Sequence, residues 1–365
     1  MEGDRWTYES ISYLGRWDSF YRNQHRFDKG CNQRDCFQYF DDGVSGGADR
    51  SFLCRTGRGN DIPIDRQLRH YTRHGVKKAW PDGYIVRELS RIPSNFRSEG
   101  TIQDFLKEQD IPGIAGIDTR ALTKILREKG TMNGMITTNE NYNVDEIVPK
   151  LKEYRVGDVV TVTTCSEKEV LPGDGPKVAL MDFGAKNNIA RSLNNRGCEV
   201  TIYPAHTSAE EIIESHPDGI MLSNGPGDPE TNVSIIKEIK KLSETDIPIF
   251  AICLGHQLMA LAHGAKTYKL KYGHRGGNHP VKDLSNNRVY ISSQNHGYAV
   301  DASTVDADVA KEAFVNVNDG TNEGLAYIGK NIFTVQFHPE ACPGPQDSGY
   351  LFDRFIDMMN NREEK

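Results

Sequence analysis

A cysteine at the end of an apolar run is the residue of this chain best placed for nucleophilic chemistry. The apolar residues Ile249–Ile252 lead into Cys253, and a helical pattern of leucines at 254, 258 and 261 follows at once. This order predicts a sharp strand-to-helix turn at the carboxyl edge of a sheet, with the thiol at the positive end of a helix dipole. Such a position favours the thiolate, which is the nucleophilic form of cysteine.

A histidine followed two residues later by a carboxylate is the expected partner of this thiol. His338 and Glu340 follow a predicted strand at 332–337. An imidazole can take the thiol proton, and a carboxylate can orient the imidazole. A lone buried cysteine is usually a small hydrophobe, and a His-Pro-Glu triplet alone is a weak signal. Together, each at a strand end, they predict a Cys253–His338–Glu340 catalytic triad.

Two further loops are expected beside this triad. Ser223–Pro229 follows a strand one βα unit before the cysteine, so it should lie at the same sheet edge. Gly225 and Gly227 let its backbone approach a ligand, and its N–H groups can hold an oxyanion, although in isolation the loop reads as an ordinary tight turn. The segment Ser292–Tyr298 also follows a predicted strand, and its backbone and amide groups can bind the charged groups of an amino acid. His296 within it is a second candidate base, but Glu340 can orient only His338.

No metal site is predicted. The segment Tyr272–Pro280 is dense in histidine and glycine, yet it lacks carboxylate or thiolate ligands at a useful spacing, so we expect a structural loop near the site. Cys31 and Cys36 have no second pair of ligands.

The elements that must position these residues alternate between strand and helix. Alternation predicts a mostly parallel or mixed sheet flanked by helices. Ser208 is the expected cap of one helix, with Glu211 at its third position. Strands are predicted at 178–183, 199–203, 219–223, 248–252, 289–293 and 332–337; helices are predicted at 101–108, 119–129, 187–196, 208–215, 231–243 and 349–360.

Composition limits the classes of partner and compartment. The formal net charge is −7 without a long basic run, so neither nucleic acid nor a membrane surface is an expected partner. No apolar stretch reaches the roughly 20 residues of a membrane span, and residues 1–10 lack the apolar core of a signal peptide. Seven cysteines without a framework spacing predict reduced thiols and a cytoplasmic protein.

From about Trp80 to the C-terminus the chain resembles the carbamoyl phosphate synthase small-chain family, whose C-terminal part is a class I glutamine amidotransferase domain. Gly116–Gly130 resembles that family's N-terminal domain, which other amidotransferase subunits lack. The amidotransferase motifs are 182–186, 223–229, 252–257, 273–280, 294–297 and 338–340.

The resemblance implies that Cys253 attacks glutamine, that His338 carries protons and that Glu340 holds the imidazole. It implies backbone contacts to the oxyanion from Gly225 and Leu254. The remaining residues implied for the glutamine pocket are Gly227, Gln257, Asn295, Gly297 and Tyr298. No phosphate loop is present, so the resemblance places ATP and Mg on a large partner chain that receives ammonia, and no cofactor on this chain. The implied role is in arginine and pyrimidine biosynthesis.

The first 79 residues depart from the family. They hold eleven arginines and only eight Leu, Ile or Val. A family segment resembling Glu-Ile-Val-Phe-Asn-Thr is absent. Codons that can encode Arg34–Tyr39 specify this segment when the reading frame starts one nucleotide later. The same shift of the reading frame gives family-like sequence as far as residue 79. We hypothesise that residues 34–79 are translated out of frame. DNA sequencing from codon 30 to codon 82 tests this, and an uninterrupted frame would count against a sequencing error.

We therefore expect three regions: an aberrant segment at 1–79, disordered or non-native; the remainder of a smaller, disrupted α/β N-terminal domain at 80–170; and an amidotransferase domain at 177–361. The Pro/Gly-rich residues 171–176 are the expected linker. Two alternatives stay open. One is another class I amidotransferase subunit, and the other is a non-enzymatic remnant inactivated by the N-terminal damage.

Overall fold

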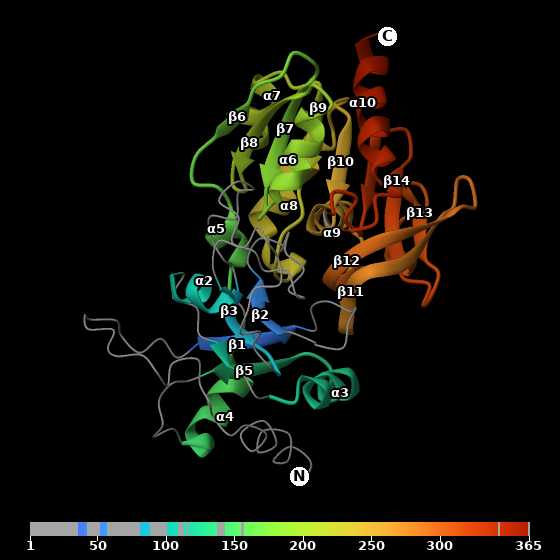
Figure 1. Cartoon of the computed structure of the whole chain (residues 1–365). Coiled ribbons are helices and arrows are strands. Elements are labelled where there is room, and N and C mark those ends of the chain that lie inside the picture. The colour runs from blue at the N-terminus through green and yellow to red at the C-terminus, as the bar shows by residue number, and fades with distance from the viewer. Residues whose placement is uncertain are drawn as a thin grey trace. The chain divides into compact units, whose positions relative to one another are not determined.

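The structure is a computed structural model of the 365-residue chain. It describes residues 36–41, 52–56, 81–87, 101–108, 113–114, 117–136, 143–154, 157–341 and 344–363. These residues form two compact units, one within 36–154 and one within 157–363 (Figure 1). The expectation that residues 1–79 are aberrant falls mostly outside the described residues, apart from two short strands.

The first unit is a five-stranded sheet with helices. Its strand order is β4-β3-β2-β1-β5, antiparallel except for the β3–β4 pair. The strands are β1 (Cys36–Asp41), β2 (Phe52–Thr56), β3 (Pro81–Ile85), β4 (Gly113–Ile114) and β5 (Met132–Ile136), and the helices are α2 (Ile102–Glu108), α3 (Thr119–Lys129) and α4 (Val144–Glu153).

Helix α3 supplies the apolar core of this unit. Asp118 caps it by accepting hydrogen bonds from two backbone N–H groups of the first turn. It ends at Gly130, whose φ of +91° is readily adopted only by glycine. Leu122 and Leu126 are four residues apart, so they share one face of the helix and pack with buried isoleucines of the same unit. The helices predicted at 101–108 and 119–129 are confirmed by α2 and α3.

The second unit is built on a ten-stranded mixed sheet. The strand order is β12-β11-β13-β14-β15-β10-β9-β7-β8-β6, and β15, β10, β9, β7 and β8 are parallel neighbours. Its strands are β6 (Glu169–Leu171), β7 (Lys177–Asp182), β8 (Glu199–Pro204), β9 (Gly219–Leu222), β10 (Ile249–Ile252), β11 (Thr267–Asp283), β12 (Val289–Val300), β13 (Ala310–Asn316), β14 (Asn322–Tyr327) and β15 (Ile332–Val335).

Helices cover both faces of the parallel part. Because alternate residues of a strand point to opposite faces, neighbours such as Leu180 and Met181 belong to different apolar clusters. One cluster includes residues of α7, α8 and α9, and the other includes residues of α6 and α10 (Figure 1). The helices are α5 (Val159–Thr163), α6 (Asn187–Asn194), α7 (Ala209–Glu214), α8 (Val233–Leu242), α9 (Leu254–Ala262) and α10 (Tyr350–Glu363), with short 3₁₀ helices η1 (Pro229–Thr231) and η2 (Ala302–Thr304).

This architecture confirms the predicted mixed sheet flanked by helices, including the expected cap of α7. Ser208 Oγ accepts a hydrogen bond from the Glu211 backbone N–H at 3.2 Å. The unit begins earlier than the Pro/Gly-rich segment, at Gly157. Residues 171–176 connect β6 and β7 within one sheet, because Glu169–Leu171 pairs with β8.

Across the described residues, no helix has the length and apolar character that crossing a bilayer requires.

Candidate active site

Four parallel strands bring the motif residues to one edge of the sheet. Strand β10 lies between β9 and β15, with Ile252 opposite Val335. Strand β9 also pairs with β7. The carboxyl ends of all four strands therefore meet, and the segments that follow them contain Lys186, Gly225, Cys253 and His338.

Cys253 lies on a strained turn between β10 and α9. Its φ of +53° is in the left-handed region, which costs a non-glycine residue about 1–3 kcal/mol. The backbone N–H of Cys253 donates to Val335 O at 2.8 Å, and that of Gly255 donates to Ser223 O at 3.1 Å. A Cβ on Gly255 would lie 2.6 Å from Leu222 O, so only glycine lets α9 start this close to β9. These contacts hold the thiol at the start of a helix, as the sequence predicts.

His338 and Glu340 form a buried pair beside Cys253. His338 Nδ1 lies 2.7 Å from Glu340 Oε1, which leaves Nε2 as the ring nitrogen that faces the Cys253 sulfur. Burial and the Lys186 ammonium lower the pKa of His338. The Glu340 carboxylate and the Cys253 sulfur outweigh both and raise it to about 9. The imidazole is therefore orientated through Nδ1, with Nε2 free to exchange a proton with a reacting group.

Lys186, the last residue of the motif at 182–186, is a buried cation to which the sequence analysis assigns no role. Its Nζ lies 3.3 Å from Glu340 Oε1, and its side chain is 6% exposed. Burial raises the pKa of Glu340, but His338 and Lys186 outweigh it and bring the pKa to about 2. The side-chain amide of Asn188 also donates to the backbone carbonyl of Glu340. Glu340 is thus held as a carboxylate by two cations.

Lys186→Met is expected to lower the free energy of unfolding at pH 7 by about 3–5 kcal/mol, because it removes one partner of a buried ion pair. The substitution should also make the free energy of unfolding less sensitive to acid pH. The Glu340 contribution is complete above its unfolded pKa of 4.5 and is lost as pH falls toward the folded value of about 2. Without Lys186 the folded pKa rises, so less stability is lost over that range.

Urea unfolding between pH 7 and pH 3.5 measures both effects. Lys241→Met is the matched control, because Lys241 is exposed and pairs with Glu210 and Glu238 on the surface. It should change the free energy of unfolding by no more than about 1 kcal/mol. Equal stability and equal acid dependence in Lys186→Met and the wild type would contradict the assigned ion pair.

The loop Ser223–Pro229 approaches the start of α9 closely. A Cβ on Gly225 would lie 2.3 Å from Phe183 O and 2.6 Å from Leu254 Cδ2, and Gly227 has a φ of +96°. Asn224 Oδ1 accepts a hydrogen bond from the Lys186 backbone N–H at 2.9 Å. The glycines therefore bring a bare backbone beside Cys253, as an oxyanion-binding loop requires.

The other residues expected in the glutamine pocket lie on α9 and β12. Gln257 is buried in α9, and its Nε2 donates to Tyr298 O at 2.8 Å and to Gln336 Oε1 at 2.9 Å. Its amide oxygen remains as the group that can face a ligand. Leu254 is buried at the start of α9, while Asn295, Gly297 and Tyr298 are partly exposed on β12. The backbone N–H of His338 donates to Ser293 O at 2.9 Å, which joins β12 to the segment after β15.

Two other histidines of the motifs, His256 and His296, are buried and hydrogen-bonded within the protein, so they are poorly suited to act as the catalytic base. His296 Nδ1 lies 2.7 Å from Tyr298 O and its Nε2 lies 2.6 Å from Gln294 Oε1, so each ring nitrogen faces an oxygen of the protein and a neutral imidazole donates to one of the two. Burial lowers the pKa of His296 well below its usual value. His256 Nδ1 lies 2.8 Å from Thr334 Oγ1, and burial lowers its pKa to about 3.

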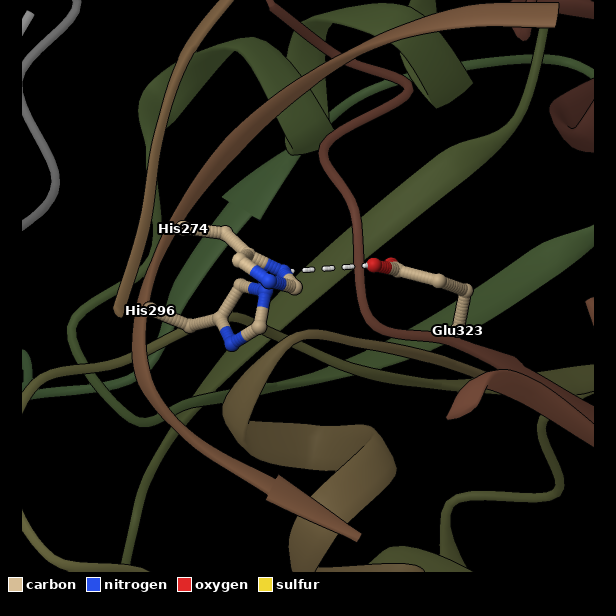
Figure 2. Close-up of side chains that lie close together, drawn as sticks. All are labelled: His274, His296 and Glu323. Atoms are coloured by element: carbon tan, nitrogen blue, oxygen red, sulfur yellow. Dashed lines mark ion pairs between the residues drawn. The ribbon is translucent and has the colours of Figure 1, made fainter. Parts of the chain in front are cut away.

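His274, His296 and Glu323 converge from β11, β12 and β14, with candidate ligand atoms within 4.8 Å of one another (Figure 2). Tetrahedral zinc, with bonds of about 2.1 Å, would need ligand atoms about 3.4 Å apart. His274 instead pairs with Asp319 at 2.8 Å and lies 3.5 Å from Glu323. Burial lowers the pKa of His274, but these carboxylates outweigh it and raise it. His274 and these two carboxylates are arranged as an ion-pair network. Residues 272–280 contain no carboxylate, and both partners of His274 come from later segments of the chain.

Two family models match this chain. Residues 179–358 match the model for glutamine amidotransferase class-I. Residues 64–136 match the model for the carbamoyl-phosphate synthase small chain, CPSase domain. The unit that contains Cys253 and His338 is therefore a class I glutamine amidotransferase domain.

Named relatives cover both domains. The carbamoyl phosphate synthase small chain of Listeria monocytogenes (strain F2365) is 50% identical over 283 residues, 77% of this chain and 77% of the relative. That of Clostridium perfringens is 51% identical over 274 residues, 75% of this chain and 77% of the relative. This chain belongs to the carbamoyl phosphate synthase small-chain family.

A solved structure of a glutamine amidotransferase from Thermotoga maritima is 18% identical, with a TM-score of 0.38, over 53% of this chain and 87% of that one.

Proposed function

We propose that this chain is the glutamine-hydrolysing subunit of a carbamoyl phosphate synthase. The observation that carries the proposal is the meeting of Cys253 and the His338–Glu340 pair at the ends of adjacent parallel strands. A thiol at a helix start, an imidazole with one free nitrogen and a carboxylate that orients it are the groups that hydrolysis of a carboxamide needs.

In the first half-reaction the Cys253 sulfur attacks the side-chain carbonyl carbon of glutamine. The carbon–sulfur bond forms as the carbonyl electron pair moves to oxygen, and the backbone at Gly225 and Leu254 stabilises the oxyanion. His338 holds the thiol proton and delivers it to the amide nitrogen. The carbon–nitrogen bond then breaks, ammonia leaves and a γ-glutamyl thioester remains.

In the second half-reaction water replaces ammonia. His338 Nε2 takes a proton from water as the water oxygen attacks the thioester carbon, and the carbon–sulfur bond breaks. The sulfur leaves as a thiolate beside the protonated His338, which is the state from which the first half-reaction starts, and glutamate leaves. The sum is glutamine and water to glutamate and ammonia, with no cofactor on this chain. Glu340 holds the imidazole in the same orientation throughout.

A large chain is the partner that this chemistry requires. Ammonia in water near neutral pH takes up a proton, and ammonium has no lone pair with which to attack a carbonyl derivative. An enclosed path from this chain to a large chain that binds ATP and Mg would keep ammonia reactive. We place the product in carbamoyl phosphate synthesis for arginine and pyrimidines, in the cytoplasm.

An electrophilic glutamine analogue is expected to modify Cys253 and none of the other six cysteines. The analogue should occupy the glutamine pocket and present its reactive carbon to Cys253. Peptide mapping by mass spectrometry locates the label, and a parallel sample with excess glutamine should be protected. Modification of another cysteine at a comparable rate would overturn the assigned nucleophile.

Two alternatives have less support. Another class I amidotransferase subunit would not explain the match of residues 64–136 to the small-chain domain. A non-enzymatic remnant would leave the three catalytic positions without a use, although it fits the hypothesis that residues 34–79 are translated out of frame. Glutamate release, measured with and without a large synthase chain, separates the three possibilities. Glutamate release that increases when the large chain is added would support the proposal.

A further inference from the structure

Two segments that flank the expected glutamine pocket are tied together by one side-chain hydrogen bond. Tyr298 Oη on β12 donates a hydrogen bond of 3.0 Å to Asp228 Oδ2. Asp228 lies near the end of the loop Ser223–Pro229, called the glycine loop below. The two residues are 70 positions apart in the sequence, and both are partly buried. A carboxylate acceptor makes this a charge-assisted bond, which is stronger than a bond between neutral groups.

The Asp228 end of this bond is fixed by the start of η1. Asp228 Oδ1 accepts from the Glu230 backbone N–H at 3.0 Å. The backbone carbonyl of Asp228 accepts from Thr231 Oγ1 at 2.7 Å and from Asn232 Nδ2 at 3.1 Å. The carboxylate therefore has one oxygen occupied by the helix cap and presents the other to Tyr298.

The Tyr298 end is fixed by the helix that follows the nucleophile. Tyr298 O accepts from Gln257 Nε2 at 2.8 Å, and Gln257 lies one helical turn after Cys253. Burial and the Asp228 carboxylate raise the pKa of Tyr298, so its hydroxyl keeps the proton that it donates.

These contacts close a ring around the nucleophile. From Cys253 the ring runs along α9 to Gln257, across to Tyr298, through the hydroxyl to Asp228, and back along the glycine loop to Gly225. A Cβ on Gly225 would lie 2.6 Å from Leu254 Cδ2, so the loop returns to the residue after the nucleophile. The Tyr298–Asp228 bond is the link in this ring that joins β12 to the glycine loop.

We propose that Asp228 and Tyr298 form a clasp that sets the width of the glutamine pocket, with Asp228 as a positioning residue that acts through Tyr298 and the glycine loop. This inference rests on the proposed function. Without the clasp the loop and β12 sample wider separations, and closing them on the substrate costs binding free energy. The triad is unchanged, and closure on the substrate returns the backbone at Gly225 to the same place, so the effect falls on KM and not on kcat.

The clasp is tested by glutamate release at varied glutamine concentration. Tyr298→Phe and Asp228→Ala should each raise KM about tenfold, with kcat within about twofold of the wild type. The double variant should be no worse than the poorer single variant, because both remove one bond. Asp228→Asn keeps an oxygen that can accept from Tyr298, so its KM should lie between those of the wild type and Asp228→Ala.

Asp228→Ala also removes the cap of η1, and Asp301→Ala is the matched control for that effect because it removes the cap of another 3₁₀ helix, η2. Asp301 accepts from the Ser303 backbone N–H at 3.0 Å at the start of η2, as Asp228 does at η1. Its KM should equal that of the wild type. A KM for Tyr298→Phe within twofold of the wild type, or single effects that multiply in the double variant, would overturn the clasp.

A second measurement separates failure of the clasp from failure of the proposed function. Hydrogen exchange of the backbone amides of residues 223–232 needs no activity. The clasp predicts faster exchange there in Tyr298→Phe than in the wild type, even if the wild type releases no glutamate. Unchanged exchange would overturn the clasp whatever the activity, whereas absence of glutamate release from the wild type would overturn only the proposed function.

Discussion

Cys253→Ser is expected to lower kcat for glutamate release by at least about 10³-fold while the fold is retained. A serine hydroxyl is far less acidic than a thiol, so it supplies almost no anion at neutral pH. The side chains are of similar size, and Cys253 is only 3% exposed, so the packing should survive. Steady-state kinetics measures the loss, and circular dichroism with thermal unfolding checks the fold.

Cys198→Ser is the control for placing a hydroxyl in the same apolar cluster. Cys198 and Cys253 belong to one buried cluster, and burial raises the pKa of the Cys198 thiol. Cys198→Ser should lower Tm but retain kcat at 25 °C. Undiminished hydrolysis by Cys253→Ser, or an equal loss in Cys198→Ser, would exclude Cys253 as the nucleophile.

The order of residues along the chain was enough to predict much of this domain. Apolar runs of four to six residues, each followed by a helical pattern, identified β7, β9 and β10. Parallel strands end at one edge, so a cysteine after β10 and a histidine after β15 could be placed together without knowing the strand order. The same argument brought the glycine loop after β9 to that edge.

The ionic environment of the site could not be predicted in this way. Lys186 reaches Glu340 from a segment more than 150 residues earlier, and no periodicity relates the two. The same limit applies to Glu323 beside His274, and to Asp228 beside Tyr298. Local patterns report which elements form, whereas these pairs depend on how the elements pack. The start of the second unit at Gly157 could not be predicted either, because the Pro/Gly-rich residues 171–176 lead from β6 to β7 within one sheet.

Gly225→Ala should lower kcat about 10²–10³-fold, because the new Cβ would lie 2.3 Å from Phe183 O. Backbone atoms oppose it on that side, so the loop must move away from the start of α9. Displacing an oxyanion donor by about 1 Å costs rate, since stabilisation requires donors at hydrogen-bond distance in the transition state. Modification of Cys253 by a small alkylating agent such as iodoacetamide should be retained, because that reaction develops no oxyanion.

Gly157→Ala provides the matched comparison. A Cβ at Gly157 meets nothing within 4 Å, and its φ is not in the left-handed region, so the substitution should leave kcat and Tm unchanged. If Gly225→Ala raised KM alone with kcat intact, the loop would be a wall of the pocket and not a source of oxyanion donors. If it lost iodoacetamide reactivity together with kcat, the substitution would have disturbed the thiol itself. Only a fall in kcat with the thiol still reactive assigns transition-state stabilisation to the backbone of this loop.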